Sequence, residues 1–354
     1  MLKKLFSAIL ALCMTAGALP AAYAKAEGTA PEEINGFYRI SSSEDLLWFA
    51  NEVNENNRYD INAFLENDID LDGVQWTPIG DGYDYKDNGI VGDTAYNGIF
   101  DGNGHTVSNL KILTKKYTIQ GKQHYDTYCQ GLFGIIGKSG TVKNLTVSGN
   151  VNARAGGNEY VEAAHFVGGI SGINAGLILN CTNNADITGH YNVGGISGAV
   201  GIQLSGKERV SGRIINCVNN GNVVSTSSSS AHAGGITGQL SMGTISYAAN
   251  HGDVLAPYKE NVIGSSVRIV SLGGIVGSDV NIKGSGFIDR AYNDGNIGNL
   301  DGNYIAGIIG LSYNTTASNV YNTGKVTGAN YSGGLAGFVI GGSIENAYSS
   351  EPVS

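Results

Sequence analysis

Three aspartates at alternate positions are the clearest candidates for metal chemistry in this chain. Asp68, Asp70 and Asp72 match the opening D-x-D-x-D-G of a helix-flanked calcium-binding loop. The twelfth position of such a loop requires a bidentate acid, and here it is Ile79. The alternative is an ordinary strand whose apolar residues point inward and whose acids point outward. The sequence leaves both interpretations open, with calcium as the only cofactor considered.

The histidines and cysteines form no pattern for zinc or nucleophilic chemistry. No H-E-x-x-H occurs among the six histidines, which excludes a zinc protease of the usual kind. Cys181 and Cys217 occupy positions where equivalent segments of the chain carry Ala or Val, so we interpret them as buried small hydrophobic residues. An odd, sparse set of cysteines outside the first 24 residues does not predict a disulfide framework.

Enzymes that cleave glycans need paired carboxylates across a cleft, or a metal-binding acid cluster beside a base. The chain has no Asp-Asp pair, no G-H-G and no R-x-K, which are the motifs expected of galacturonan hydrolases. Asp186, Asp253 and Asp294 fall in turn positions, which turn formation alone explains. We therefore predict a non-catalytic protein without catalytic residues. A polysaccharide lyase or hydrolase stays the alternative, because the bases of lyases vary.

Tyr292, Tyr321 and Tyr348 are the residues that we favour for binding. Each directly follows a core-type position, where the alternation of a strand turns the side chain outward. On successive strands about 4.8 Å apart, such a row gives a flat amphipathic strip suited to stacking on sugars or anchoring a partner protein. Outward tyrosine rows also stabilise sheets by pairing with each other, so a purely structural role is the alternative.

A repeat with a glycine-rich phrase positions these tyrosines. The phrase VGGISG occurs at 167–172 and at 193–198, with near-copies at 233–238, 272–277, 305–310 and 332–337. An asparagine-rich phrase such as INCVNNGNV (215–223) follows each copy. Seven units begin at QGLFG (130–134) and are spaced by about 26 to 40 residues, a period that indicates a solenoid or a propeller.

The local pattern favours a β-solenoid. Short apolar segments, often β-branched, alternate with Gly, Asn and Asp, and no helical periodicity is sustained. Propeller blades of the WD type would show their own dipeptide signature, which is missing. Uneven spacing suits a coil that lengthens at its corners, and four long corner segments are further candidates for a binding face: 152–166, 202–212, 225–233 and 256–268. We predict an all-β, right-handed parallel β-helix with one coil per unit.

Equivalent positions of the units form columns with consistent chemistry. One column is small or apolar and is predicted to face inward: Leu145, Cys181, Cys217, Ala248, Ala291, Val320 and Ala347. A second is mostly asparagine but is interrupted by Tyr247 and Arg290: Asn144, Asn180, Asn216, Asn319 and Asn346. A third contains Asn183, Asn219, Asn250, Asn293 and Asn322. Asparagine tolerates the left-handed backbone of sharp corners, and stacked amides can bond one another. The glycines of VGGISG are predicted at bends, with its isoleucine in the core.

A different segment precedes the repeats. Residues 40–54 carry Ser41 and Glu44 in a capping-box spacing, followed by an apolar helical face of Leu46, Leu47, Ala50 and Val53. An open solenoid end exposes core and unpaired strand edges, so this helix is predicted to cover that end.

The first 24 residues have the basic start, apolar run and small-x-small end of a secretory signal peptide. We predict cleavage after Ala24 and a linker over 25–36. The chain has a formal net charge of −9 and becomes more acidic once the leader lysines are removed. Such a chain is unsuited to bind nucleic acid, and no further apolar stretch is long enough to span a membrane.

Together these segments resemble the GLUG-repeat family of bacterial extracellular proteins. The resemblance rests on YRISSSEDLLWFANEVN, LENDIDLDGVQWTPIG, GIFDGNGHTVSNLKI, GLFGIIGKSGTVKNLTVSG and the GGI-x-G … NC-x-N-x-G-x-V units, from about Tyr38 to the C-terminus. Members occur as repeat modules of surface adhesins and in the non-catalytic regions of immunoglobulin-cleaving proteases. The resemblance implies a pectate-lyase-like β-helix and a surface role, without a defined ligand.

The resulting expectation divides the chain into an N-terminal cap with the first coils (37–120) and GLUG-type repeats (121–354). We expect an exported, adhesin-like, monomeric module, secreted or at the cell surface, that binds a glycan or a host protein through one solenoid face. A β-helix lyase or hydrolase is one alternative. A structural spacer of a larger surface assembly is the other.

Overall fold

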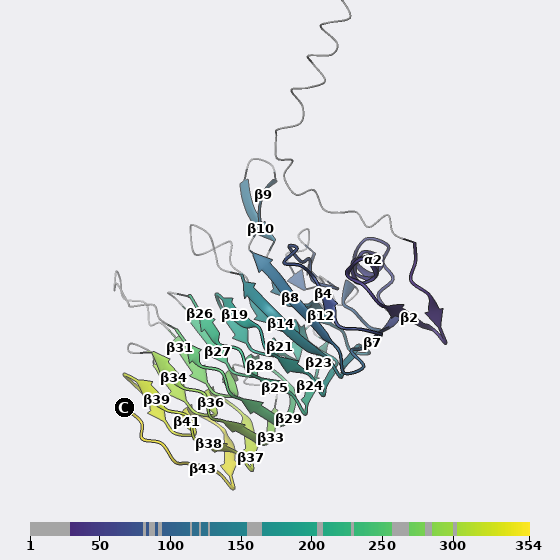
Figure 1. Cartoon of the computed structure of the whole chain (residues 1–354). Coiled ribbons are helices and arrows are strands. Elements are labelled where there is room, and N and C mark those ends of the chain that lie inside the picture. Colours follow the sequence, from purple (N-terminus) through teal and green to yellow (C-terminus); the bar gives the residue numbers. More distant parts are fainter. Residues whose placement is uncertain are drawn as a thin grey trace, which may run out of the picture.

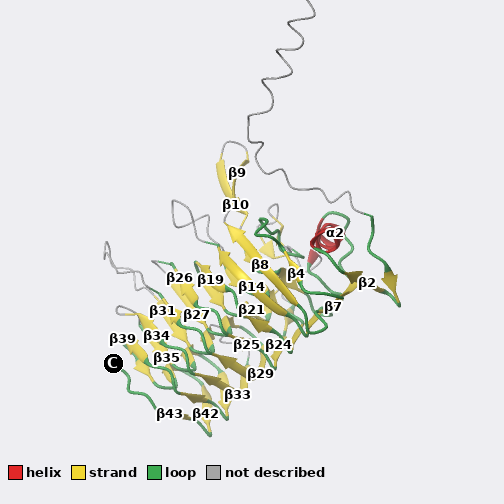
Figure 2. Cartoon of the chain, viewed as in Figure 1, coloured by secondary structure: helices red, strands yellow, loops and turns green. Residues whose placement is uncertain are grey.

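The computed structural model describes residues 29–80, 83–84, 89–90, 94–113, 115–119, 122–126, 128–153, 165–203, 208–227, 230–256, 269–279, 285–299 and 303–354. The predicted leader lies outside these residues, as do 25–28 of the linker and parts of the four long corner segments, namely 154–164, 204–207, 228–229 and 257–268. The described chain is almost entirely β-structure with one helix, α2 (Ser43–Asn54) (Figures 1 and 2).

Two seven-stranded parallel sheets carry the glycine phrases, because each phrase supplies one strand to each sheet. The first sheet contains β11 (Cys129–Gln130), β15 (Phe166–Gly168), β20 (Asn192–Gly194), β27 (Ser230–Gly234), β31 (Ile269–Gly273), β35 (Tyr304–Ala306) and β40 (Ser332–Gly333). The second contains β12 (Phe133–Ile136), β16 (Ser171–Asn174), β21 (Ser197–Val200), β28 (Thr237–Leu240), β32 (Val276–Asp279), β36 (Ile309–Ser312) and β41 (Ala336–Val339).

A 23-stranded sheet forms the remaining wall. In each coil this sheet turns a corner at the residue of the second column, such as Asn180. The strands before this corner are β7 (Ile99–Asp101), β13 (Thr141–Lys143), β17 (Leu177–Leu179), β24 (Gly212–Ile215), β37 (Thr315–Ser318) and β42 (Gly342–Glu345). The strands directly after the corner are β18 (Thr182–Asn183), β25 (Val218–Asn219), β38 (Tyr321–Asn322) and β43 (Tyr348–Ser349). The next strands of the same coils are β19 (Asp186–Gly189), β26 (Val223–Ser225), β30 (Val254–Leu255), β34 (Ile297–Asn299) and β39 (Val326–Gly328). Longer strands cover more than one of these positions: β8 (Thr106–Leu113), β14 (Thr146–Asn152), β29 (Gly243–Asn250) and β33 (Gly286–Asn293).

The N-terminal strands β1 (Glu33–Ile34), β2 (Phe37–Ile40), β3 (Asn62–Leu65) and β4 (Ile69–Asp70) join the same large sheet. Three antiparallel pairs project from the stack: β5 (Tyr83–Asp84) with β6 (Gly89–Ile90), β9 (Lys115–Ile119) with β10 (Lys122–Asp126), and β22 (Ile202–Gln203) with β23 (Arg209–Val210). Within the repeats, each strand pairs in parallel with its equivalent one unit later, for example Val193 with Ala233, so the described chain is solenoid-like.

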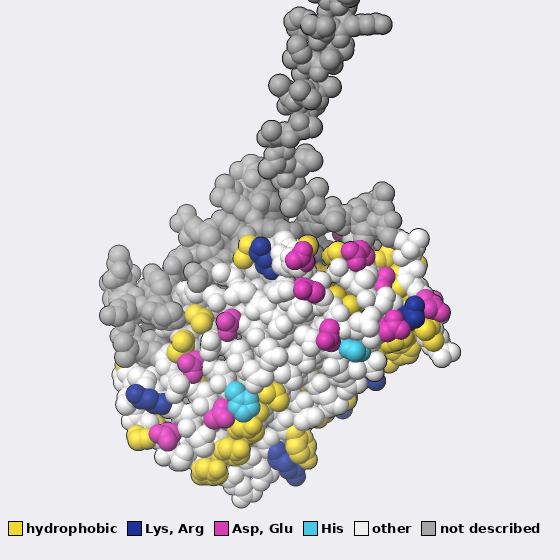
Figure 3. Space-filling view, in the orientation of Figure 1, with side chains coloured by type: hydrophobic (Ala, Val, Ile, Leu, Met, Phe, Trp, Pro, Cys, Tyr) yellow, Lys and Arg dark blue, Asp and Glu magenta, His cyan; other side chains and the backbone are white. Residues whose placement is uncertain are grey.

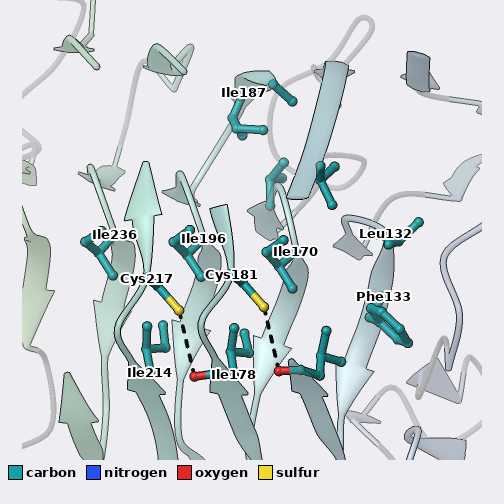
Figure 4. Close-up of a cluster of buried hydrophobic side chains, with 14 of the residues drawn as sticks. Leu132, Phe133, Ile170, Ile178, Cys181, Ile187, Ile196, Ile214, Cys217 and Ile236 are labelled. Atoms are coloured by element: carbon teal, nitrogen blue, oxygen red, sulfur yellow. Dashed lines mark hydrogen bonds between the residues drawn. The ribbon is translucent and has the colours of Figure 1, made fainter. Parts of the chain in front are cut away.

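The core runs along the interior of the stack, as the sequence predicted. The isoleucines of the glycine phrases are fully buried: Ile170, Ile196, Ile236, Ile275 and Ile308. The inward column is buried too, except for Ala347, which is partly exposed in the final coil. Cys181 and Cys217 belong to this column, and their Sγ atoms point at backbone oxygens of the preceding coil, 3.7 Å from Val142 and 3.8 Å from Ile178 (Figure 4). Burial raises the pKa of Cys181 well above its usual value, so this thiol is inert.

The third column forms a continuous ladder of buried amides. Each Nδ2 donates to the Oδ1 of the asparagine one coil later, at 2.8 Å from Asn183 to Asn219 and at 2.7 Å for the three following steps, which end at Asn322. The same Nδ2 also donates to the carbonyl two residues on, such as that of Gly252 for Asn250. All five side chains are fully buried, so the ladder satisfies polar groups that would otherwise be costly inside the core.

The second glycine of each phrase lies where the chain bends between the two seven-stranded sheets, as the sequence predicted. None of the glycines of the phrase has a positive φ, so the bend alone does not require glycine. A Cβ on Gly169, Gly195 or Gly235 would overlap the asparagine side chain of the same unit, which is Asn183 for Gly169. The ladder therefore adds a reason that the sequence did not show: the second glycine leaves room for an amide.

The second column does carry the left-handed corners that the sequence predicted. Asn144, Asn180 and Asn216 have φ values of 52°, 54° and 54°. Tyr247 and Arg290, which interrupt the asparagines, adopt the same backbone at 54° and 52°. The corner geometry is therefore imposed by the coil and does not depend on the residue that occupies it.

Helix α2 lies at the N-terminal end of the stack, where Phe49 packs 6.0 Å from Tyr96 and 5.8 Å from Phe100 between ring centroids (Figure 1). The predicted capping box is displaced by one residue. Ser42 Oγ accepts from the Asp45 amide at 3.2 Å, and the Asp45 carboxylate accepts from the Ser41 amide at 2.9 Å. Glu44 faces solvent.

The apolar face of the helix also differs from the prediction. Phe49 is fully buried, whereas Leu47 is only partly covered. The coil below the helix supplies aromatic partners at the position of Phe49, and local periodicity alone cannot show this.

We predict that Asn250→Ala lowers the free energy of unfolding by about 2 to 4 kcal/mol, because the neighbouring asparagines each lose a buried partner. Urea unfolding followed by circular dichroism measures the change. Asn216→Gly is the matched control, since it removes an exposed, bonded amide of the corner column but keeps the left-handed corner. It should lower the free energy of unfolding by about 1 kcal/mol or less. Equal losses in both variants would show that burial of the ladder does not matter.

Histidine burial predicts a pH dependence of stability. Burial lowers the pKa of His232 to about 4 from an ordinary value of 6.5, and its Nδ1 is buried without a hydrogen-bond partner. Burial, with nearby His190, also lowers the pKa of His165. Above pH 6.5 both the folded and unfolded forms of these rings are neutral. Below it the unfolded chain takes up the protons first, so stability falls as the pH falls towards 4.

For His232 alone this loss reaches up to about 3 kcal/mol at the acid end. The adjacent coil carries Asn192 in the paired position, which makes His232→Asn the natural test. Urea unfolding of both proteins between about pH 7 and pH 4 should show a shallower fall for the variant. Parallel profiles would contradict the assignment.

Candidate functional site

The tyrosine row lies on the outer face of the large sheet, in register across three coils. Tyr292 pairs with Tyr321, and Tyr321 with Tyr348. The same column continues towards the N-terminus through smaller residues: Ala249, Val218, Thr182, Thr146 and Thr106. The outward orientation predicted for the tyrosines is confirmed, since Tyr348 is 56% exposed and the other two are partly exposed.

The three rings stack on one another and do not lie flat on the sheet. The centroids of Tyr292 and Tyr321 are 4.9 Å apart with ring planes 2° from parallel, and those of Tyr321 and Tyr348 are 5.3 Å apart at 5°. Parallel rings this close must overlap face to face with an offset, because rings lying side by side in one plane would clash. The row therefore presents ring edges and hydroxyl groups, which differs from the flat stacking strip expected from the sequence.

Tyr292 ends a hydrogen-bonded chain of three side chains. Its hydroxyl lies 3.3 Å from Nε2 of His251, and Nδ1 of His251 lies 2.8 Å from the Asp294 carboxylate. The His251 and Tyr292 rings meet edge to face, with centroids 5.5 Å apart. Because Nδ1 donates to the carboxylate, Nε2 is left to accept the proton of the phenol.

The two inner phenols of the row have raised pKa values. Burial, reinforced by the Asp294 carboxylate, raises the pKa of Tyr292. Burial and the flanking tyrosines also raise the pKa of Tyr321. Raised values keep both phenols protonated, so they donate hydrogen bonds and do not act as bases near neutral pH.

A second pair stands beside the row, where the corner column departs from asparagine. The Arg290 guanidinium lies 5.0 Å from the centre of the Tyr247 ring and donates to its hydroxyl at 2.8 Å. Arg290 also donates to Asp289 at 2.7 Å. Figure 3 shows hydrophobic side chains gathered over the C-terminal coils, beside a histidine and acidic and basic groups.

Sequence reasoning missed His251, Asp294, Tyr247 and Arg290 as members of this site. The available signal was the interruption of the asparagine column by Tyr247 and Arg290, which are partly exposed or exposed in the structure. His251 and Asp294 are 43 residues apart in sequence, and only the register of the coils brings them together.

The three aspartates near the N-terminus lie on the outer face of a strand whose Ile69 and Leu71 are buried. Asp68 accepts from the Thr106 amide at 2.9 Å and Asp70 from Asn109 Nδ2 at 2.7 Å. These bonds lower the pKa of both carboxyl groups.

Over the residues that the structure describes, no three acidic, histidine or cysteine side chains come together in a group that could hold a metal ion. Asp68 and Asp70 instead bond to Thr106 and Asn109 of the next coil.

One solved structure shares this fold. It is a Bacteroides ovatus protein named as a "putative immunoglobulin A1 protease", with a TM-score of 0.54 over 92% of this chain and 88% of that one. The two sequences are 16% identical, so the likeness concerns the fold alone.

Sequence comparison gives a partial relative. Halomucin of Haloquadratum walsbyi is 30% identical over 184 residues, which is 50% of this chain but 2% of halomucin. The chain therefore matches only a small part of that protein. No protein-family model matches the chain. In the described part of the chain, no helix has the length and apolar character needed to cross a membrane.

Calcium can be tested directly. Because the carboxylates already accept protein hydrogen bonds, we expect added calcium to leave the melting temperature unchanged, and Asp70→Ala to lower it equally with and without calcium. Differential scanning calorimetry measures both. A calcium-dependent rise in the wild type that is absent in Asp70→Ala would instead establish a metal site at Asp68, Asp70 and Asp72.

Proposed function

We propose that this is an exported, non-catalytic extracellular repeat protein, secreted or held at the cell surface, that binds a glycan or host protein through the face bearing Tyr292, Tyr321 and Tyr348. The observation that carries the proposal is the in-register row of outward phenols, which replaces the smaller residues of the same column only in these coils.

The proposed architecture is a right-handed parallel β-helix of the pectate-lyase kind, built from GLUG-type repeats. Parallel pairing of equivalent strands in three sheets supports it, as does the fold shared with the Bacteroides ovatus structure. An extracellular role is supported by the leader-like first 24 residues and by the names of both similar proteins, a mucin and an immunoglobulin protease.

Solenoid geometry suits such binding. The stacked rings hold their hydroxyl groups at fixed spacing on a rigid sheet, so little conformational entropy is lost when a ligand binds. The raised pKa of Tyr321 keeps its hydroxyl able to donate to a ligand, whereas the Tyr292 hydroxyl donates to His251 and can accept. A ligand with regularly repeated acceptors, or a partner surface with a complementary strip, matches this face.

The test is retention of the purified protein on immobilised polysaccharides and on immobilised host glycoproteins, with the supernatant assayed for released sugars. Immunoglobulin A1 is incubated in parallel and checked for cleavage. We expect retention without release of sugar and without cleavage. Sugar release would establish the lyase or hydrolase alternative, and no retention on any surface would favour the spacer.

Variants connect retention to the proposed face. Tyr321→Thr introduces the residue that Thr146 and Thr182 show to be compatible with this column, and it should weaken retention by about tenfold, as expected for loss of one central contact. Tyr331→Asn is the control, an exposed tyrosine outside this sheet. Equal retention of both variants would contradict the proposal.

A further inference from the structure

Three outward columns of the large sheet change chemistry within the same two coils. The corner column changes from Asn216 to Tyr247 and Arg290, then returns to asparagine at 319. The turn column carries the bonded pair Asn184 and Asn220, followed by His251 and Asp294 in the next two coils. The tyrosine column begins at Tyr292 in the second of these coils. Unrelated substitutions would not place three such changes of residue type next to one another.

The change at the corner column works against stability. Tyr247 and Arg290 hold left-handed backbone, which asparagine tolerates with less strain. Their presence also interrupts the amide bonds that link Asn144, Asn180 and Asn216 at 3.0 and 2.9 Å. Strained backbone of this kind is concentrated at functional sites.

The cation of this patch is already paired. Arg290 bonds to Asp289 at 2.7 Å, and the neutral His251 ring donates through Nδ1 to Asp294 at 2.8 Å. An anionic polymer needs uncompensated cations that can bind its carboxylate or sulfate groups, and none of these side chains provides one. The overall charge of −9 repels such polymers further.

The ring faces, donors and acceptors that remain available suit the hydroxyl groups and C–H surfaces of a neutral sugar. The side chain of Tyr247 is 53% exposed, and a ring with one face against a guanidinium can present its other face to the C–H surface of a pyranose. Arg290 bonds to Asp289 and Tyr247 through Nη1, so the N–H groups on its other nitrogens can donate to a ligand. The carboxylates retain lone pairs that can accept. Donors and acceptors so interspersed can pair with the vicinal diols of a sugar.

We infer that five side chains form a binding site for an uncharged glycan: Tyr247, His251, Arg290, Tyr292 and Asp294. Tyr321 and Tyr348 extend this site over the next two coils. This rests on the proposed function and names its ligand class. The stacked row holds successive ring centroids 4.9 and 5.3 Å apart, a spacing that follows the coil repeat. A polymer lying along the solenoid axis would meet them in sequence.

The experiment measures binding of the full protein to two panels by affinity gel electrophoresis and biolayer interferometry. The neutral panel is galactomannan, xyloglucan and arabinogalactan, and the acidic panel is alginate, hyaluronan and polygalacturonate. We expect binding to a neutral polymer only, with an affinity that changes less than about twofold between about 50 and 500 mM NaCl, because no net charge is neutralised.

Two variants restore the asparagine of the corner column, Tyr247→Asn and Arg290→Asn. Each should lose at least about tenfold in affinity for the neutral polymer, as for removal of an anchoring side chain, while its melting temperature stays equal or rises. Tyr331→Asn is the matched control, because Tyr331 is likewise an exposed tyrosine, with a φ of 46°, but lies outside the patch. It should keep full affinity.

The outcomes separate this inference from the proposed function. Salt-sensitive binding to acidic polymers alone, or binding to a host protein and to no glycan, would overturn the inference and leave the proposed function standing. So would neutral-glycan binding that Tyr321→Thr weakens while Tyr247→Asn and Arg290→Asn do not. Absence of binding to every polymer and host protein would overturn both.

Discussion

The buried amide ladder is the interaction on which the rest of the structure depends. Each asparagine from Asn183 to Asn322 must meet its equivalent at hydrogen-bond distance, because an unpaired amide in this core would cost more than the ladder contributes. This requirement holds the five coils that carry it in one register. It also excludes a side chain at glycines such as Gly235, and so it explains the second glycine of the repeated phrase.

A fixed register turns sequence columns into surface rows, and the outer face can then vary without disturbing the interior. The column that ends in tyrosine begins with threonine, and backbone pairing continues through the change. Function on this scaffold therefore depends on which residues occupy a few outward columns. His251 and Asp294 show the result, since partners 43 residues apart in sequence become neighbours only through the stack.

Much of the fold follows from the sequence alone. The inward column, the left-handed asparagine corners and the outward tyrosines were predictable, because alternation and residue type act locally. The orientation of the tyrosine rings was not, since it depends on contacts between coils. The same limit applies to the second glycine of each phrase, whose neighbour is a side chain 14 to 24 residues away, from Gly169–Asn183 to Gly195–Asn219. In α2, Phe49 packs against rings of the coil beneath it, and no pattern within the helix shows which of its apolar residues those rings select.

The pairing of glycine and asparagine has an evolutionary consequence. Gly195 makes room for Asn219 of its own unit, whereas the amide of Asn219 extends to Asn250 of the next. The glycine and the asparagine of one unit therefore fit each other, and each unit offers the same amide hydrogen bond to the unit before it and to the unit after it. Gene duplication or unequal crossing-over can add or delete whole units without any compensating substitution. The number of coils is therefore free to change in a lineage, whereas the spacing between Gly and Asn can change only where a corner absorbs the difference.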